Sequence, residues 1–240
     1  MARPKRFYTR AGVGEHEGGF ALLLDGRLAK TPAKAALVLP TLAAAEAVAS
    51  EWQAQNEDID FASMPLTRIA NAAIDGVAGD MEAVAAEIVK YADTDLVCYR
   101  AAAPASLVKA EAEAWDPIIA FAASRLGARF MCVEGIVFVG QPPAAKAAVQ
   151  AKVDEVARRG RAAPFALASL SVMTTLTGSV LIALALAEDA ISLDEAWRTA
   201  HVDEDFEMRL WGEDQQAMAR RARRFAEMAA AERLWRLVAA

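Results

Sequence analysis

The pattern of apolar and polar positions changes about forty residues into the chain. Before that point, short apolar runs alternate with turn-forming pairs. The stretch FALLLDGRLAKTP, residues 20–32, places Asp25 and Gly26 between two such runs. An Asp-Gly pair in this setting favours a β-hairpin, because glycine accepts a positive φ angle. The stretch EHEGG supplies another turn upstream, and Pro32 and Pro40 bracket a further short strand. The first forty residues therefore predict a small antiparallel sheet.

From Thr41 onward the apolar period is that of helices. Thr41 can cap a helix in which apolar residues recur at spacings of three and four as far as Trp52. Two short helices are expected over residues 66–76 and 80–93, each with polar residues at both ends. The polar stretch NEDIDFASMP separates the first helix from the others, so we place a domain boundary there, near residue 61.

The apolar pattern of the second half of the chain predicts mostly helices. A long helix over residues 104–127 contains Pro117, which should kink or restart it. Residues 129–140 alternate around Glu134 and Gly135 and predict a second hairpin. The sequence therefore indicates an α+β fold, with a small β-rich N-terminal domain, residues 1–61, and a larger, mainly helical C-terminal domain, residues 62–240.

Residues 162–187 carry no charge and raise the question of a membrane span. Serine and threonine dilute the first two thirds, which leaves only VLIALALA, residues 180–187, as a continuous apolar run. A spanning helix needs roughly 20 apolar residues. We expect one buried core helix, or two that separate near Gly178, and no membrane insertion.

Charge and cysteine content narrow the class of protein further. The net charge of −6 argues against nucleic-acid binding, which normally needs a clustered excess of lysine and arginine. Cys98 and Cys132 are far apart and lack paired spacing, as is usual in a reducing compartment, and we expect both to be small buried hydrophobic residues. The first ten residues lack the apolar core of a secretory signal.

The densest cluster of charges is HVDEDFEMRLWGEDQQAMARRARRF, residues 201–225. If residues 192–212 form one helix, Trp197, Met208 and Trp211 share a buried arc, and Glu204 falls within it. Gly212 can end that helix, and a second one then carries Arg221 on its own apolar arc. Residues 204 and 221 are equidistant from the turn. These positions predict a partly buried ion pair between Glu204 and Arg221, while the remaining charges favour a solvated surface over a dedicated binding patch.

Motifs of known enzyme classes do not occur in the sequence. It has no dinucleotide or P-loop glycine pattern and no nucleophile elbow, and its two histidines are not spaced as metal ligands. The stretch YADTDLVCYR offers Asp93 and Asp95, which turn capping explains. The sequence therefore predicts neither a catalytic site nor a metal or cofactor.

A series of short motifs, in this order and spacing, resembles the assembly chaperones of the F-type ATP synthase that act on its alpha subunit. The motifs are KRFY, LDGRLAKTP, EWQAQ, MPLTRIANAAIDG, DTDLVCYR, WDPI and DFEMRLWGEDQQA. The resemblance implies a protein without enzymatic activity that covers the apolar, subunit-facing surface of the free alpha subunit until assembly. Mitochondrial members of that family carry an import segment, whereas KRFY begins at Lys5 here, so the resemblance implies a bacterial protein of the cytoplasm.

The resemblance also implies residues that bind the partner. They are Trp52, Gln55, Leu66, Thr67, Asn71, Asp75, Glu204, Phe206, Trp211 and Glu213. Gln215 and Gln216 depart from the family pattern, since many relatives carry an acid there. The apolar arcs leave an alternative open for Trp52 and Trp211, because a tryptophan on such an arc is more often part of the core.

Two other functions stay open at this point. A small-molecule enzyme of an unrecognised type could use Asp93, Asp95 and Glu204, and it would need a deep pocket with convergent polar groups. A constitutive oligomer subunit would need a large apolar interface.

Overall fold

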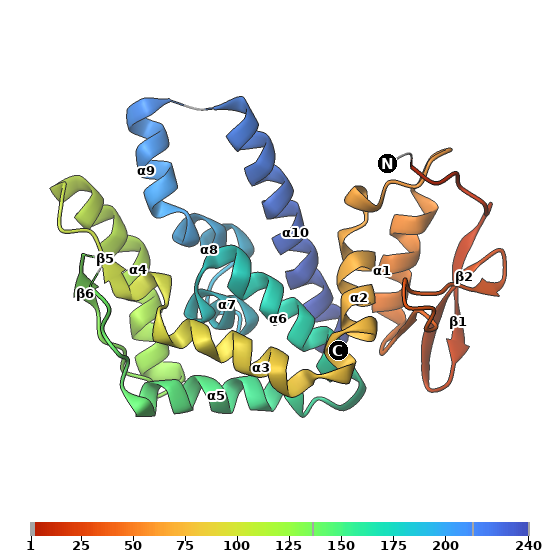
Figure 1. The fold of residues 1–240 in the computed structure, drawn as a ribbon, viewed down its shortest axis with the longest axis horizontal. Helices are drawn as coiled ribbons and strands as arrows, with labels where there is room; N and C mark the ends of the chain where they lie inside the picture. The colour runs from red at the N-terminus through yellow and green to blue at the C-terminus, as the bar shows by residue number, and fades with distance from the viewer. Residues whose placement is uncertain (1–2, 136, 213, 240) are drawn as a thin grey trace.

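The computed structural model describes residues 3–135, 137–212 and 214–239. A small sheet lies at one end of the molecule, and helices with one short two-stranded sheet form most of the rest (Figure 1). The expected α+β class is confirmed. The boundary expected near residue 61 falls at a short 3-10 turn, Phe61–Ser63, but the apolar core runs without a break across it. The division into two domains stays a prediction.

The N-terminal sheet consists of β1 (Ala11–His16), β2 (Gly19–Leu24), β3 (Arg27–Leu28) and β4 (Val38–Leu39). Strand β2 is central and pairs antiparallel with the other three. The expected hairpin turn is confirmed, because Asp25 and Gly26 have φ angles of 48° and 79°, as a tight two-residue turn requires. Glu17 and Gly18 form the same kind of turn between β1 and β2, with φ angles of 43° and 80°.

Ten helices follow among the described residues. They are α1 (Leu42–Gln53), α2 (Pro65–Asp75), α3 (Met81–Lys90), α4 (Ala105–Arg125), α5 (Pro143–Ala157), α6 (Ala163–Thr177), α7 (Val180–Ala187), α8 (Leu193–Ala200), α9 (Val202–Trp211) and α10 (Gln215–Ala239). Short 3-10 turns lie at Phe61–Ser63, Val77–Gly79, Tyr91–Asp93, Leu96–Cys98 and Gly160–Ala162. Thr41 caps α1 as expected, accepting a hydrogen bond from the Ala44 amide.

The uncharged stretch forms the centre of the helical part. It divides into α6 and α7 at Gly178, which has a φ angle of 68°, so the alternative with two helices is confirmed. All but the last residue of α7 are buried, and α6 packs on α2, α3, α5 and α10. No helix in the described ranges is long and apolar enough to cross a membrane.

The structure decides three local expectations, and two of them need correction. Residues 129–140 do not form a hairpin. Instead, β6 (Val133–Glu134) pairs in parallel with the distant β5 (Tyr99–Arg100). Helix α4 continues through Pro117 without a restart. The helix expected over residues 192–212 ends at Ala200 and begins again at Val202, because His201 adopts a non-helical conformation (φ −122°, ψ 26°).

Candidate functional site

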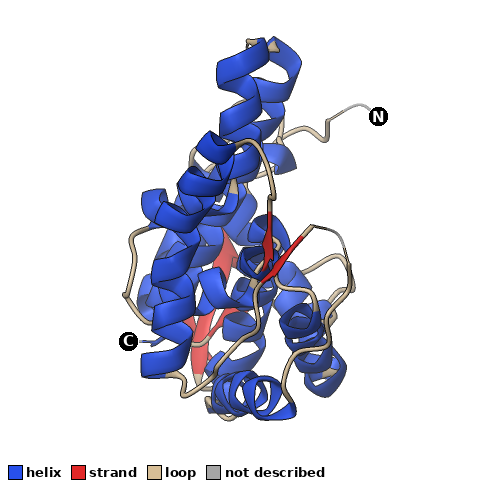
Figure 2. Ribbon diagram, turned by 90° about the vertical axis from the view of Figure 1, so that its left-hand side faces the viewer, coloured by secondary structure: helices blue, strands red, loops and turns tan. Residues whose placement is uncertain are grey.

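Helices α9 and α10 form a hairpin that projects from the body of the protein, and we call it the arm (Figure 1). The same hairpin reaches the top of the side view in Figure 2. The sequence of α10 explains why one part projects and the other is anchored. Its buried residues all lie from Met228 onward, where the helix packs on α6, α2 and α1, whereas residues 215–225 are rich in glutamine and arginine.

The two helices of the arm enclose a groove of about 440 Å³ near its free end. Met208 and Met218 provide its apolar part, and acidic and basic side chains surround them. The charged lining residues are Glu204, Glu207, Asp214, Arg220, Arg221 and Arg224. Beside the groove, Leu210 is 61% exposed and Trp211 is 86% exposed. The free end of the arm therefore combines flexible methionines, both signs of charge and an unusually exposed tryptophan, which is typical of an adaptable binding surface.

The expected ion pair between Glu204 and Arg221 is wrong by one residue. The carboxylate that pairs with Arg221 belongs to Asp205, at 2.5 Å, and both side chains are largely buried. The Glu204 carboxylate lies 3.9 Å from His201 Nε2 instead. The break at His201 explains the difference, because α9 starts afresh there and turns a different face toward α10. The same break leaves Trp211 on the surface instead of on a buried arc.

His201 lies at the base of the arm and is buried. Its ring stacks on Trp197 with centroids 3.9 Å apart, and its Nδ1 is 2.7 Å from the Trp197 carbonyl oxygen. Trp197 also contacts Phe225 of α10, at 5.3 Å between ring centroids. Burial lowers the pKa of His201, although the Trp197 carbonyl and Glu204 act in the opposite direction. His201 therefore belongs to the packed base of the arm.

Trp52 and Gln55, in the EWQAQ motif, are buried. Gln55 braces the loop after α1: its side-chain amide donates to the Glu51 carbonyl, and its side-chain oxygen accepts from the Asp60 amide at 2.8 Å. Trp52 packs between Tyr8 and Phe61. The core position that the apolar arc left open for Trp52 is confirmed. Both side chains are largely buried, and the partner-binding role expected for these two residues stays a prediction.

Leu66 and Thr67 are also buried, at the start of α2. Both of their amides and the Thr67 hydroxyl donate to the carboxylate of Glu51, each at 2.8 Å. Helix α2 has no capping side chain of its own, so the distant Glu51 supplies its N-terminal acceptor. Sequence reasoning missed Glu51, although its place in the EWQAQ motif could have indicated it. Leu66 and Thr67 thus have a structural role at the start of α2, and their expected role in partner binding stays a prediction.

Asn71 and Asp75 continue along α2. Asp75 ties the helix to the sheet region, accepting from the Thr31 hydroxyl at 2.5 Å and from the Ala33 amide at 3.0 Å. The Asn71 side-chain oxygen is buried without a hydrogen-bond partner among the described residues. Of the ten residues expected to bind a partner, Glu204, Phe206 and Trp211 lie on the arm, and Glu213 lies outside the described residues.

Comparison with known proteins identifies the family. The profile described as ATP12 chaperone protein matches residues 5–123. A candidate chaperone from Agrobacterium tumefaciens has a similar structure, with a TM-score of 0.93 and 45% sequence identity over 98% of this chain and 86% of that one. The chain belongs to the ATP12 chaperone family. Atp12 from Paracoccus denitrificans is similar as well, with a TM-score of 0.90 and 42% identity over 98% of both chains.

Membership of the ATP12 family confirms the resemblance to the assembly chaperones of the ATP synthase. The family profile ends at residue 123, before the arm begins, but the similar structures cover 98% of this chain. The arm is therefore part of the fold that this ATP12-family chaperone shares with its solved relatives.

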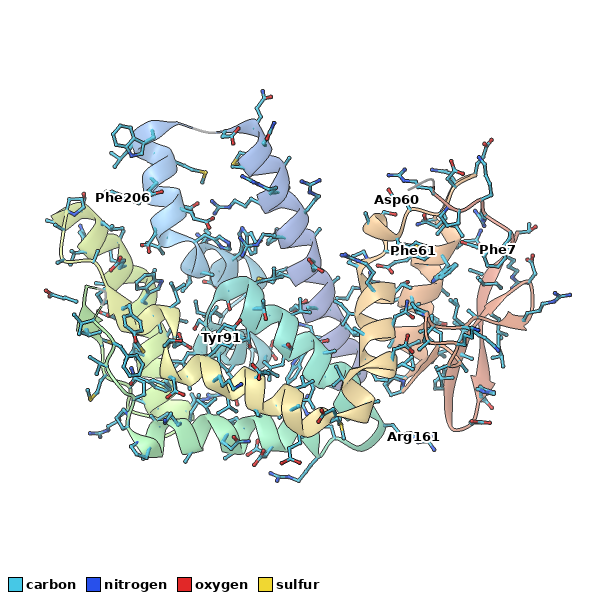
Figure 3. The ribbon with its side chains drawn as sticks, in the orientation of Figure 1. Phe7, Asp60, Phe61, Tyr91, Arg161 and Phe206 are labelled. Carbon is cyan, nitrogen blue, oxygen red and sulfur yellow. The ribbon has the colours of Figure 1, made fainter. Side chains whose placement is uncertain are left out.

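A second exposed apolar area lies at the opposite end of the chaperone from the arm. Phe7 is 72% exposed, and Phe61 and Leu28 are also exposed. Figure 3 shows Phe7 and Phe61 near the sheet, and Phe206 across the molecule on α9. Phe7 and Leu28 border a cavity of about 560 Å³ whose floor includes Tyr8 and Trp52. The chaperone thus presents apolar surface at both ends.

The acids considered for an enzyme lie in separate environments. Asp93 pairs with Lys146 of α5 at 2.9 Å. Asp95 is completely buried and accepts from the Val97 amide at 3.3 Å and from the Leu181 amide, at the start of α7, at 3.1 Å. Burial raises the pKa of Asp95 to about 6, against the opposing effect of its hydrogen bonds. Within the described ranges, no three metal-ligating side chains come together as a metal site. Asp93 and Asp95 therefore have structural roles in this fold.

Proposed function

We propose that this chaperone binds the free alpha subunit of the catalytic sector of the F-type ATP synthase and covers its subunit-facing surface until assembly. We infer that it acts by binding and not by catalysis, and that it works in the bacterial cytoplasm. Its membership of the ATP12 family supports the role in assembly. The structural roles of Asp93 and Asp95 remove two of the three acids that a catalytic alternative needed.

The free end of the arm is the contact that we propose for the alpha subunit. The observation that carries this assignment is the exposure of Trp211 at 86%, next to Leu210 at 61%. Tryptophan is enriched among the residues that dominate binding energy, and a soluble protein seldom leaves one this exposed without a partner. Phe206 on the same helix adds a further aromatic ring, with the Arg209 guanidinium 5.7 Å from its centroid.

The charges around the groove give the contact its specificity. Helix α9 contributes acidic side chains to the groove and α10 contributes arginines, so a partner with complementary charges would be oriented as it binds. Methionine side chains adapt to uneven apolar surfaces. The arm can therefore hold an apolar surface for a limited time without the close fit of a permanent interface.

The test combines capture of the alpha subunit with suppression of its aggregation. Tagged wild-type chaperone should retain the alpha subunit from the same organism and lower the light scattering of isolated alpha subunit. The Leu210→Ser, Trp211→Ser double variant should do neither, and both positions are exposed, so the fold should not change.

A second pair of adjacent, exposed apolar residues provides the control. Val137 and Phe138 are 69% and 64% exposed and lie in the segment after β6, which is not part of the arm. The Val137→Ser, Phe138→Ser variant should behave as wild type. Equal losses for the two variants would refute the arm as the contact, and wild-type chaperone that ignores the alpha subunit would refute the function itself.

A further inference from the structure

The two cysteines lie side by side on the short parallel sheet. Cys98 directly precedes β5 and Cys132 directly precedes β6, and the register pairs Tyr99 with Val133, so the cysteines occupy the adjoining pair of positions. Neighbouring strands lie about 4.8 Å apart, and disulfide-bonded cysteines have Cα atoms roughly 4.4–6.8 Å apart. Cysteine spacing could not predict this pairing, because it depends on contact between two segments that α4 separates in the chain.

The segment that carries Cys132 is held on both sides of the cysteine. The side chain of Gln141, which is buried, accepts from the Met131 amide at 2.8 Å and donates to the Met131 carbonyl at 2.9 Å. The Gly135 amide donates to the Arg100 carbonyl at 2.8 Å. These contacts fix the backbone of residues 131–135 against β5, so the backbone at Cys132 is held beside the backbone at Cys98.

The two thiols differ in exposure and in charge environment. Cys98 is fully buried, whereas Cys132 is exposed, which corrects the expectation that both are buried. The Arg100 Nη2 lies 4.0 Å from the Cys132 sulfur. Asp116, at 2.9 Å, and the Val97 carbonyl, at 2.8 Å, hold that guanidinium in place.

The environment of Cys132 favours its thiolate form. The neighbouring Cys98 thiol and the Arg100 charge lower the pKa of Cys132, against the opposing effect of its partial burial. The neighbouring Cys132 and burial raise the pKa of Cys98. Cys132 is therefore the nucleophile of the pair, and Cys98 is a protonated thiol within reach of it.

We propose that Cys98 and Cys132 form a peroxide-reactive dithiol that closes to an intramolecular disulfide. The Cys132 thiolate attacks one oxygen of hydrogen peroxide, the O–O bond breaks, and the leaving hydroxide takes up a proton to become water. Cys132 is then a sulfenic acid. The Cys98 sulfur attacks the Cys132 sulfur, the S–O bond breaks, and hydroxide leaves with the Cys98 proton as a second water. The two thiols lose two electrons together, and the peroxide gains them.

Exposure of the full-length protein to limiting hydrogen peroxide, followed by mass spectrometry under non-reducing conditions, tests the proposal. The wild type should lose about 2 Da, the mass of two hydrogens, and yield one peptide pair joined through Cys98 and Cys132. Reduction with dithiothreitol should restore both thiols. Cys98→Ala should instead accumulate a sulfenic acid at Cys132 that dimedone traps, and Cys132→Ser should leave Cys98 unmodified.

A second measurement uses only wild-type thiols and arginine variants, so it does not depend on folding of the cysteine variants. Iodoacetamide should alkylate Cys132 before Cys98, and Arg100→Gln should slow this reaction and shift its pH profile upward. Arg129→Gln, an exposed arginine on the same segment, provides the matched control and should leave the rate unchanged. Disulfide-linked dimers through Cys132, or equal alkylation of both cysteines, would overturn the proposal.

Discussion

The carboxylate of Glu51 should contribute more to stability than any surface charge of the helical part. Replacement by alanine removes three hydrogen bonds of 2.8 Å at once and leaves the Leu66 and Thr67 amides at the start of α2 without an acceptor. Each unsatisfied buried donor costs about 1–3 kcal/mol. Burial raises the pKa of Glu51, because the buried carboxylate charge carries a free-energy cost, so removing the charge recovers part of the lost stability.

These opposing effects lead us to expect a net loss of about 3 kcal/mol for Glu51→Ala and about half of that for Glu51→Gln, which keeps one accepting oxygen. In a chain of this size, such a loss lowers the Tm by roughly 6–12 °C. Calorimetry or circular dichroism measures the shift.

Glu46, an exposed residue of the same helix, provides the control. Glu46→Ala should change the Tm by no more than about 2 °C, since exposed substitutions usually cost within 0.5 kcal/mol. Equal shifts for the Glu46 and Glu51 variants would refute the assignment of Glu51 as the cap of α2.

Two further predictions concern the arm and the pH dependence of stability. Asp205→Ala should destabilise the arm by about 2 kcal/mol, because it leaves the buried Arg221 guanidinium unpaired, whereas Glu204→Ala should be nearly silent. Hydrogen exchange of peptides from α9 and α10 measures the difference, and equal protection in both variants would contradict it. Burial raises the pKa of Asp95 from 3.8 to about 6, so the folded state holds this proton more tightly than the unfolded state does. The stability that comes from protonated Asp95 is fully present below pH 3.8 and is lost as the pH rises through about 6. Over this range the free energy of unfolding of the wild type should fall by about 3 kcal/mol relative to that of Asp95→Asn. Urea denaturation of both proteins at pH 4 and pH 7 measures this loss, and an unchanged difference between them would contradict the role of burial.

Local signals predicted much of the fold. The turn at Asp25 and Gly26, the cap at Thr41 and the division at Gly178 each depend on the conformational preference of one or two residues, so the sequence alone indicates them. The pairing of β5 with β6 could not be predicted in this way, because its two strands are joined only through α4. The break at His201 has no glycine or proline to signal it, and it changed both the partner of Arg221 and the exposure of Trp211.

The family motifs predicted the family correctly. As a guide to partner-binding residues, they selected several residues that have structural roles. Gln55, Leu66 and Thr67 have internal partners in the fold, so their presence in a motif reflects the contact between α1 and α2. Helical periodicity could not separate such residues from binding residues, since both lie beside apolar positions. Of the residues expected to bind a partner, Trp211 is the one whose exposure distinguishes it most clearly.

The affinity of the purified chaperone for isolated alpha subunit tests the central claim most directly. Titration calorimetry should show one-to-one binding by the wild type, and the Leu210→Ser, Trp211→Ser variant should bind at least roughly 30-fold more weakly, since loss of a central tryptophan typically costs 2 kcal/mol or more. A variant that binds as tightly as the wild type, or a wild type that does not bind, would contradict the account.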